Sequence, residues 1–239
     1  MFNFKKVVVT GGCGFIGSAL IRNLLKSTNA RVFNFDKMGL VSDSQSINTL
    51  LKSNPEYQNR YDFFELNLEN YTKLSEIFNE ISPDIVFHLA AESHVDRSID
   101  NPLNFLNSNI VGTYNLIETV REFLKVKQTN NFRLIHISTD EVFGSLGKSG
   151  KFNEKTRYDP KSPYSASKAC SDHLVRAWRH TYNLPFTVTN CSNNFGPWQF
   201  PEKLIPLTIL KILKGEKIPI YGNGLQIRDW LFVEDHVNA

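Results

Sequence analysis

A glycine-rich turn stands directly after the first apolar stretch of the chain. Gly11, Gly14 and Gly17 follow the three valines of residues 7–9 and open a helical pattern. Glycines let the backbone turn tightly and approach a pyrophosphate, whose charge is favoured by the N–H groups and dipole of a helix N-terminus. Asp36 ends the next apolar stretch roughly 20 residues further on, where a carboxylate binds an adenosine ribose and repels a 2′-phosphate. This spacing predicts a site for NAD rather than NADP; a purely structural turn is the alternative.

Tyr164 and Lys168 form a second candidate pair. They are four residues apart in a helical pattern, so both side chains would lie on one helix face. A nearby ammonium group stabilises tyrosinate and lowers the tyrosine pKa, so that Tyr164 would act as a base near neutral pH. Lys168 would also hold a nicotinamide ribose. An exposed pair without function is the alternative, because the chain contains eight tyrosines.

Polar residues also follow two apolar stretches that read as strands. Ser138, Thr139, Asp140 and Glu141 come after one of them, and the carboxyl ends of strands are where ligands bind in open α/β sheets. We expect Ser138 or Thr139 to bond a substrate hydroxyl beside the tyrosine, or else to cap a turn.

The second strand end reads His88-Leu-Ala-Ala-Glu-Ser-His94. Its two alanines would leave room for a cofactor. We interpret His88 and His94 as structural, since no carboxylate or histidine lies at metal-ligand spacing from them. No metal site is expected.

The elements that must position these residues alternate regularly. Short β-branched runs separated by helical patterns predict βαβ units and a doubly wound parallel sheet of the Rossmann type, an α/β fold. Strands are predicted at 6–9, 31–35, 61–65, 85–88, 133–137 and 186–190. Helices are predicted at 15–26, 71–80, 103–125 and 164–182.

The pattern of the sequence changes after Cys191. Prolines punctuate this region, one helical stretch covers 204–214, and 230–239 reads as a strand leading into a helix. We therefore expect an NAD-binding domain over 1–190 and, over 191–239, the start of a smaller substrate-binding domain that is cut off before completion.

The composition of the chain limits the kinds of partner that we expect. Lys and Arg number 27 against 24 Asp and Glu, a net charge of +3. These basic residues are scattered rather than clustered, so nucleic acid is not expected. The three cysteines form no Cys-x-x-Cys pair, which argues against a disulfide framework or a zinc site and for a reducing compartment. There is no leader and no apolar run of about 20 residues, so we expect a cytoplasmic protein without a membrane partner.

Together these motifs resemble the extended short-chain dehydrogenase/reductase family. The resemblance is carried by Thr10-Gly-Gly-Cys-Gly-Phe-Ile-Gly17, by His88-Leu-Ala-Ala-Glu-Ser-His-Val-Asp96, by Tyr164-Ser-Ala-Ser-Lys168 and by Arg228-Asp-Trp230. Within that family, Ser138-Thr-Asp-Glu-Val-Phe-Gly144 and residues 193–206 are most similar to the dTDP-glucose 4,6-dehydratase subfamily. Epimerases and decarboxylases share the glycine turn and the Tyr/Lys pair but typically lack the Asp-Glu pair.

The resemblance implies dehydration of a nucleotide-linked glucose to a 4-keto-6-deoxy sugar, with transient reduction of NAD. Tyr164 would deprotonate the 4-hydroxyl, Glu141 would remove the C5 proton, and Asp140 would protonate the departing 6-hydroxyl. Because one carboxyl must be protonated while its neighbour is ionised, like-charge proximity would help to separate their pKa values.

The resemblance also implies two sets of contacts. In addition to the glycines, Tyr164 and Lys168, the cofactor would contact Phe15, Ile16, Asp36, Lys37, Asn67, Leu68, Leu89, Ala90, Ala91, Ser108 and Asn194. The nucleotide sugar would contact Ser93, Thr139, Asn193, Lys203, Leu204, Pro219, Ile220, Tyr221 and Arg228. Arg228 would bind the diphosphate, because a guanidinium presents a planar fork to phosphate oxygens.

Two departures from the family pattern affect the cofactor site. Asn67 replaces the usual aspartate, which predicts weakened rather than lost adenine recognition, and the segment 38–46 lacks the usual pattern. A homodimer is expected through helices 103–125 and 164–182, with Leu106, Ile110, Leu174 and Trp178 in the contact; these residues could instead pack on the sheet. Two other functions stay open: another NAD-dependent sugar-nucleotide epimerase or decarboxylase, and a non-catalytic NAD-binding fragment.

Overall fold

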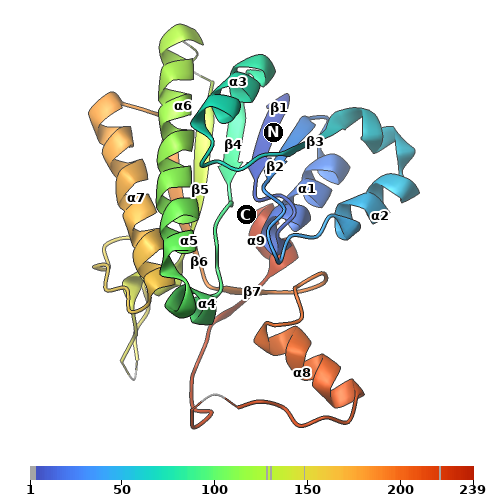
Figure 1. The fold of residues 1–239 in the computed structure, drawn as a ribbon, viewed down its shortest axis with the longest axis vertical. Helices are drawn as coiled ribbons and strands as arrows, with labels where there is room; N and C mark the ends of the chain where they lie inside the picture. Colours follow the sequence, from blue (N-terminus) through green and yellow to red (C-terminus); the bar gives the residue numbers. More distant parts are fainter. Residues whose placement is uncertain (1–3, 128, 130, 148, 221) are drawn as a thin grey trace.

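The computed structural model describes residues 4–127, 129, 131–147, 149–220 and 222–239. Its centre is a six-stranded parallel sheet in the order β3-β2-β1-β4-β5-β6 (Figure 1). The strands are β1 (Lys6–Thr10), β2 (Arg31–Asp36), β3 (Tyr61–Glu65), β4 (Ile85–His88), β5 (Arg133–Thr139) and β6 (Phe186–Cys191). All six predicted strands are confirmed, and β5 extends two residues further than predicted, through Ser138 and Thr139.

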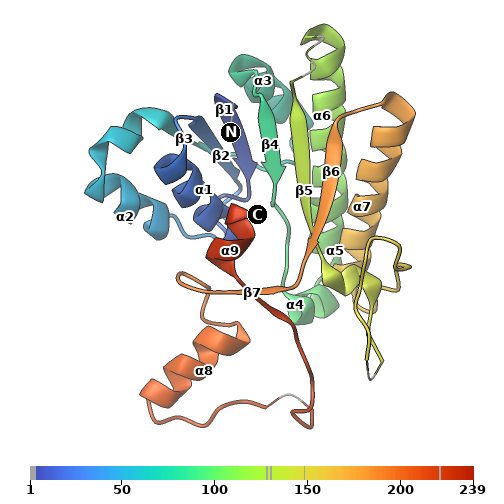
Figure 2. The ribbon, with the colours of Figure 1, turned by 180° about the vertical axis from the view of Figure 1, so that it is seen from behind.

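Helices cover both faces of the sheet (Figures 1 and 2). On one face, α3 (Tyr71–Ile81), α6 (Gly112–Lys127) and α7 (Pro163–Tyr182) pack on a core that includes Phe35, Leu134 and Phe186. On the other face, α1 (Phe15–Ser27) and α2 (Gln45–Ser53) pack on Val7, Val9 and Val32. Two-sided burial explains why the central strands are almost continuously apolar. The doubly wound Rossmann-type fold is confirmed.

The long helix predicted over 103–125 is wrong as a single element. It consists of α5 (Pro102–Phe105), a π-helical turn η2 (Leu106–Val111) and α6. Within the π turn the buried Asn109 exchanges hydrogen bonds with the backbone of Glu92, and its amide also donates to Ser167 at 2.8 Å. Such turns occur frequently at functional sites. An apolar pattern does not reveal this interruption, because the contacts that hold it come from distant segments.

Several short elements were not predicted. They are α2, the 3₁₀ turns η1 (Pro55–Arg60) and η3 (Asp140–Phe143), helix α4 (Val95–Asp100), and strand β7 (Asn193–Phe195). Most carry few buried apolar residues, so hydrophobic periodicity is too weak to identify them.

The C-terminal segment follows a different course from the sheet. Strand β7 pairs in parallel with β8 (Trp230–Phe232), and α8 (Leu204–Leu213) stands away from the sheet in both ribbon views. The last helix, α9 (Val233–Asn238), returns to pack on α1, where the Asn23 amide donates to Asn238 at 2.7 Å. None of the helices in the described ranges is long and apolar enough to cross a membrane.

Candidate active site

The glycine turn connects β1 to α1 and leaves no room for larger side chains. Gly11 has φ +71°, and a Cβ there would lie 2.7 Å from the Cα of Ala90. A Cβ on Gly17 would lie 2.2 Å from the carbonyl oxygen of Gly11. Gly14 is the N-cap of α1 and provides no side-chain cap, so the first-turn N–H groups at Phe15 and Ile16 have no side-chain partner from the N-cap. A glycine cradle against an uncapped helix N-terminus fits a pyrophosphate.

Asp36, at the end of β2, holds the glycine turn to the following loop. Its carboxylate accepts hydrogen bonds from the backbone N–H of Cys13 at 2.9 Å, from the N–H of Met38 at 2.8 Å and from the hydroxyl of Ser42 at 2.8 Å. The side chain is nearly fully buried. The predicted ribose-binding carboxylate is therefore also a structural anchor of the loops around it.

Two other predicted cofactor residues contact each other. The ammonium group of Lys37 donates to the hydroxyl of Ser108 at 2.6 Å and pairs with the carboxylate of Glu92 at 2.7 Å. These contacts bring together the end of β2, the π turn and the segment after β4.

Asn67 uses its side-chain oxygen within its own turn, where it accepts from the N–H of Glu69 at 3.0 Å. Leu68 is buried beside it, and its carbonyl oxygen accepts from the Asn115 amide. A carbonyl oxygen has a second lone pair, so Asn67 keeps some capacity toward an adenine amino group.

The segment after β4 packs against the glycine turn, where a Cβ on Gly11 would meet the backbone of Leu89 and Ala90. Leu89 donates its N–H to the Thr10 carbonyl, and Ala90 donates to the Thr10 hydroxyl, which fixes Ala90 and Ala91 beside Gly11. His88 is fully buried, and its two ring nitrogens bond the hydroxyls of Thr10 and Thr113 at 2.7 and 2.9 Å. Its role in the described structure is to connect β1 to α6.

Tyr164 and Lys168 lie on the first turns of α7, whose start is fixed by a capping box between Ser162 and Ser165. Both side chains are buried, and the Lys168 ammonium donates to the carbonyl oxygen of Ile137 at 2.9 Å. The spacing thus brings both residues to the carboxyl end of β5.

The expected lowering of the Tyr164 pKa does not occur in this structure. Burial raises the pKa of Tyr164, and the charges of Glu141 and Cys191 raise it further, while the Thr139 hydroxyl opposes them. Burial and the neighbouring acids thus set the direction of this shift. Thr139 and Glu141 are therefore neighbours of the Tyr164 hydroxyl.

Thr139, Asp140 and Glu141 stand at the end of β5, as predicted. The Thr139 hydroxyl caps η3 by accepting from the N–H of Glu141 at 3.2 Å. Burial raises the pKa of Asp140, and the charge of Asp229 adds to it. Burial also raises the pKa of Glu141, with a further rise from Asp140 that Arg228 and Lys203 oppose. The two carboxyls are thus poised to hold protons more readily than exposed acids.

Ser138 does not share this site. Its hydroxyl points into the core and donates to Asp172 at 2.8 Å. Of the two hydroxyls proposed to face a substrate, the structure leaves only Thr139 beside Tyr164.

The predicted substrate residues fall into two groups. The ammonium group of Lys203 donates to the carbonyl oxygen of Ser93 at 3.5 Å. The charges of Arg228 and Lys203 both lower the pKa of Glu141, so these two residues lie near the carboxyl pair. Leu204, Pro219 and Ile220 are exposed, and Tyr221 lies outside the described residues. Asn193 is in β7; Asn194, predicted for the cofactor, bonds His236 at 2.8 Å.

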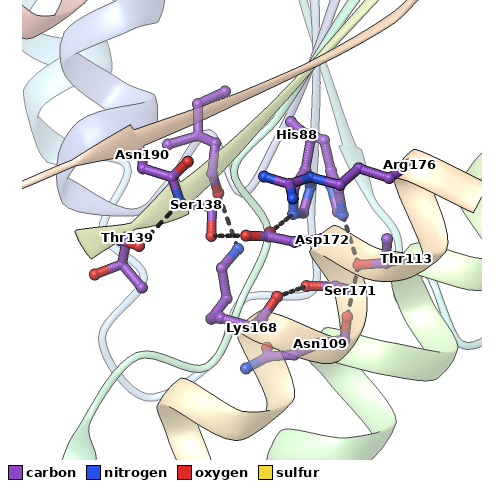
Figure 3. Close-up of polar contacts among 12 residues, drawn as sticks. His88, Asn109, Thr113, Ser138, Thr139, Lys168, Ser171, Asp172, Arg176 and Asn190 are labelled. Carbon is purple, nitrogen blue, oxygen red and sulfur yellow. Dashed lines mark hydrogen bonds and ion pairs between the residues drawn. The ribbon is translucent and has the colours of Figure 1, made fainter. Parts of the chain in front are cut away.

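Some residues of the site were not predicted. The carboxylate of Glu202 pairs with Arg97 and lies 3.7 Å from His94, which joins α4 to the segment that carries Lys203. Asp172 lies under the Tyr/Lys pair on α7, in a buried cluster with His136 and Ser138 (Figure 3). Its position four residues after Lys168 was the one signal in the sequence. The described residues contain no group of three or more His, Cys, Asp or Glu arranged to hold a metal ion.

Comparison with known proteins assigns the family. Residues 8–239 match the profile described as GDP-mannose 4,6 dehydratase. The chain belongs to this family. It is 52% identical to dTDP-glucose 4,6-dehydratase from Salmonella typhimurium over 98% of its own length and 67% of the relative. It thus spans about two thirds of the length of the curated relatives it matches.

Solved structures agree with this assignment. A dTDP-glucose 4,6-dehydratase from Streptomyces venezuelae with NAD and TYD bound is similar with a TM-score of 0.87 and 36% identity, covering 98% of this chain and 70% of that one. UDP-glucose 4-epimerase from Thermotoga maritima, with UDP-glucose, has a TM-score of 0.85 at 27% identity, over 98% of this chain and 71% of that one. Similarity of fold alone therefore does not separate a dehydratase from an epimerase.

Proposed function

We propose that this protein is an NAD-dependent sugar-nucleotide 4,6-dehydratase, a lyase, with dTDP-glucose as its substrate. One observation carries the proposal: the acids Asp140 and Glu141 stand beside Tyr164 at the carboxyl end of β5. In the sheet, β5 neighbours β4, and β4 neighbours β1, the strand that leads into the glycine cradle. Elimination of water next to a transient ketone requires two bases and an acid in one site. Tyr164, Glu141 and Asp140 would supply them. The identity of 52% to a curated dTDP-glucose 4,6-dehydratase supports the substrate.

NAD fits the residues present. The cradle of Gly11, Gly14 and Gly17 would take the pyrophosphate, Asp36 the adenosine ribose, and Lys168 the nicotinamide ribose. When bound, NAD supplies a hydride acceptor that later returns the hydride to the sugar. The relative from Streptomyces venezuelae that was solved with NAD supports this assignment.

The protein's own residues would move the protons. Tyr164 would accept the proton of the 4-hydroxyl as C4 becomes a ketone. The positive charges of Lys168 and of an oxidised nicotinamide would have to offset the burial that raises the pKa of Tyr164. The ketone acidifies the proton on C5. Glu141 takes that proton while Asp140 gives one to the 6-hydroxyl, so that the C6–O bond breaks and water leaves. A proton returned to C5 by Glu141, together with the hydride that NAD would supply to C6, would complete the 4-keto-6-deoxy product. The raised pKa of Asp140 favours the protonated form that an acid needs.

The segment after β6 would hold the nucleotide. We propose that 1–190 form the NAD-binding domain and that 191–239 contribute to substrate binding, except for α9, which packs on α1. Arg228 would pair with the diphosphate, and Lys203 would hold the sugar between Ser93 and Glu141. The Arg97–Glu202 ion pair supports this arrangement, because it fixes the approach of the Lys203 segment to α4.

Incubation with dTDP-glucose tests the function. A dehydratase forms a 4-keto-6-deoxy product; an epimerase forms the galactose isomer without loss of water; a non-catalytic fragment binds NAD and forms neither. Tyr164→Phe is the control, because it removes the first base and should abolish either reaction. Detection of the isomer alone would overturn the proposal in favour of the epimerase.

We further propose that the protein is a homodimer through the outward faces of α5, η2 and α6 beside α7. Leu103, Leu106, Val111 and Tyr114 expose between 42% and 60% of their surface there. Exposed apolar patches of this kind mark association surfaces. Leu174 and Trp178, expected in the same contact, instead pack against the sheet core, and Ile110 is half-buried. A cytoplasmic location stays a prediction; the free thiol of the exposed Cys170 is consistent with it.

A further inference from the structure

An ion pair joins two loops at the carboxyl edge of the sheet, and the proposed chemistry does not use its carboxylate. The ammonium group of Lys37, directly after β2, lies 2.7 Å from the carboxylate of Glu92, which stands in the segment after β4. The same ammonium group donates to the hydroxyl of Ser108 at 2.6 Å. Because β1 lies between β2 and β4 in the sheet, the pair connects the segments on either side of the strand that leads into the glycine turn.

This is also the point where the order of the strands reverses. The chain continues from β1 to β2 and β3 on one side and then returns to β4 on the other side of β1 (Figure 1). Ligands of open α/β sheets bind at such a reversal, in the crevice outside the carboxyl ends of the strands. A dinucleotide with its pyrophosphate on the glycine turn and its ribose at Asp36 would therefore lie in the crevice whose two sides the ion pair joins.

Glu92 is the anchored partner of the pair. Its N–H donates to the side-chain oxygen of Asn109 at 2.8 Å, and its carbonyl oxygen accepts from the Asn109 amide at 3.0 Å. The buried Asn109 also donates to Ser167 on α7 at 2.8 Å. The backbone of Glu92 is thus held to the π turn and to the helix that carries the catalytic tyrosine, while its carboxylate is left for Lys37.

Lys37 begins the loop on the other side of the crevice. This loop is tied to the glycine turn, because the N–H of Asp43 donates to the carbonyl oxygen of Cys13 at 2.8 Å. It also packs along the ion pair: a Cβ on Gly39 would lie 3.7 Å from the Lys37 Cε and 3.9 Å from a Glu92 carboxylate oxygen. The two side chains are 34% and 30% exposed, and an ion pair of this exposure is weak enough to open readily.

We propose that Glu92 is a positioning residue for the cofactor: through its ion pair with Lys37 it closes the crevice over bound NAD and slows the release of NAD. The pair opens when the dinucleotide enters and forms again once it is seated. An ammonium group has three donors, so Lys37 can hold Glu92 and Ser108 and still donate to the cofactor. The proposal rests on the proposed function for the identity of the cofactor, but it is tested by binding alone.

The rate of NADH release tests the proposal. Protein loaded with NADH is mixed with excess NAD, and the change in NADH fluorescence is followed. Glu92→Gln removes the charge at nearly constant size and should release NADH about fivefold faster, the upper range for a partly exposed ion pair. Lys37→Met removes the same pair from the other side and should speed release at least as much.

Asp62→Asn is the matched control. Its carboxylate is 32% exposed and pairs with Arg31 at 2.7 Å, close to the values for Glu92, but this pair lies at the amino ends of β2 and β3. Loss of that pair should leave the release of NADH unchanged.

Two further measurements separate an ion pair across the crevice from a general structural role of Glu92. In a Lys37→Met protein, Glu92→Gln should add nothing, because its partner is already absent. Added salt screens the pair, so it should narrow the difference in release rate between the unmodified protein and Glu92→Gln. Unchanged release in the folded single variants, or independent effects of the two changes, would overturn the proposal.

The same measurements distinguish this proposal from the proposed function. Failure of the unmodified protein to bind NADH would overturn both. The expected release rates without turnover of dTDP-glucose would count against the proposed function alone.

Discussion

The backbone N–H of Cys13 donates to the carboxylate of Asp36 at 2.9 Å, which ties the glycine turn after β1 to the end of β2. The residue predicted to select the cofactor is therefore also one that shapes the pyrophosphate cradle. Cofactor preference and loop stability should be coupled at this position.

Asp36→Arg should shift cofactor preference from NAD toward NADP, because a guanidinium attracts the 2′-phosphate that a carboxylate repels. It should also lower the free energy of unfolding by about 1–3 kcal/mol, since buried donors lose their acceptor. Titration calorimetry with both cofactors and denaturant unfolding measure the two effects. Asp43→Arg, on the same loop and exposed, is the control. Unchanged relative affinity would remove Asp36 from cofactor selection.

Gly17→Ala should weaken NAD binding at least tenfold. The new Cβ would lie 2.2 Å from the Gly11 carbonyl oxygen, so the turn must shift, at a cost of about 1–3 kcal/mol. Gly147→Ala introduces the same methyl group where no atom lies within 4 Å and should be silent. Equal NAD affinity in both variants would argue against the cradle as the pyrophosphate site.

Glu141→Gln should block the reaction after the first oxidation. The amide keeps the shape of the side chain but accepts no proton from C5. Reduced cofactor should therefore accumulate, seen as nicotinamide absorbance, without formation of the keto-deoxy product. Glu154→Gln, an exposed position, should behave like the unmodified protein. Normal product formation by Glu141→Gln would exclude it as the base.

Acid should destabilise the protein through its buried histidines. The pKa of His136 is about 4 in the folded chain against an ordinary 6.5. Between these two pH values the unfolded chain therefore binds a proton at His136 that the folded chain does not bind. This stabilisation is complete above pH 6.5 and is lost as the pH falls toward 4, by about 3 kcal/mol. The His88 pKa is lowered in the same direction.

Denaturant unfolding across that pH range checks this expectation. His136→Asn should flatten the pH dependence whatever its effect on stability at neutral pH. His180→Asn, on the exposed end of α7, should leave the slope unchanged. Parallel slopes in all three proteins would contradict the assignment to His136.

Leu103→Glu combined with Val111→Glu should convert a dimer to monomers, because two charges would have to be buried in the contact. Light scattering at micromolar concentration measures the mass. Leu225→Glu places a charge on a more exposed leucine of the C-terminal segment and should leave the dimer intact. A monomeric unmodified protein would contradict the proposal outright.

Local sequence alone determined the sheet and the positions of the candidate residues along it. Six apolar runs alternating with helical patterns can bury both faces only as a parallel doubly wound sheet, and parallel strands bring their carboxyl ends to one edge. The cradle glycines, Asp36, Tyr164 and Glu141 could therefore be predicted from spacing.

Only the tertiary structure decided what surrounds them. It placed Ser138 on Asp172 rather than in the site, opened the π turn at Asn109, and raised rather than lowered the pKa of Tyr164. Each outcome depends on groups that are far away in sequence: Ser138 and Asp172 are 34 residues apart, and Asn109 and Ser167 are 58 apart. Desolvation and charge act through space, so a local pattern specifies which residues reach the site but not the electrostatic environment that they find there.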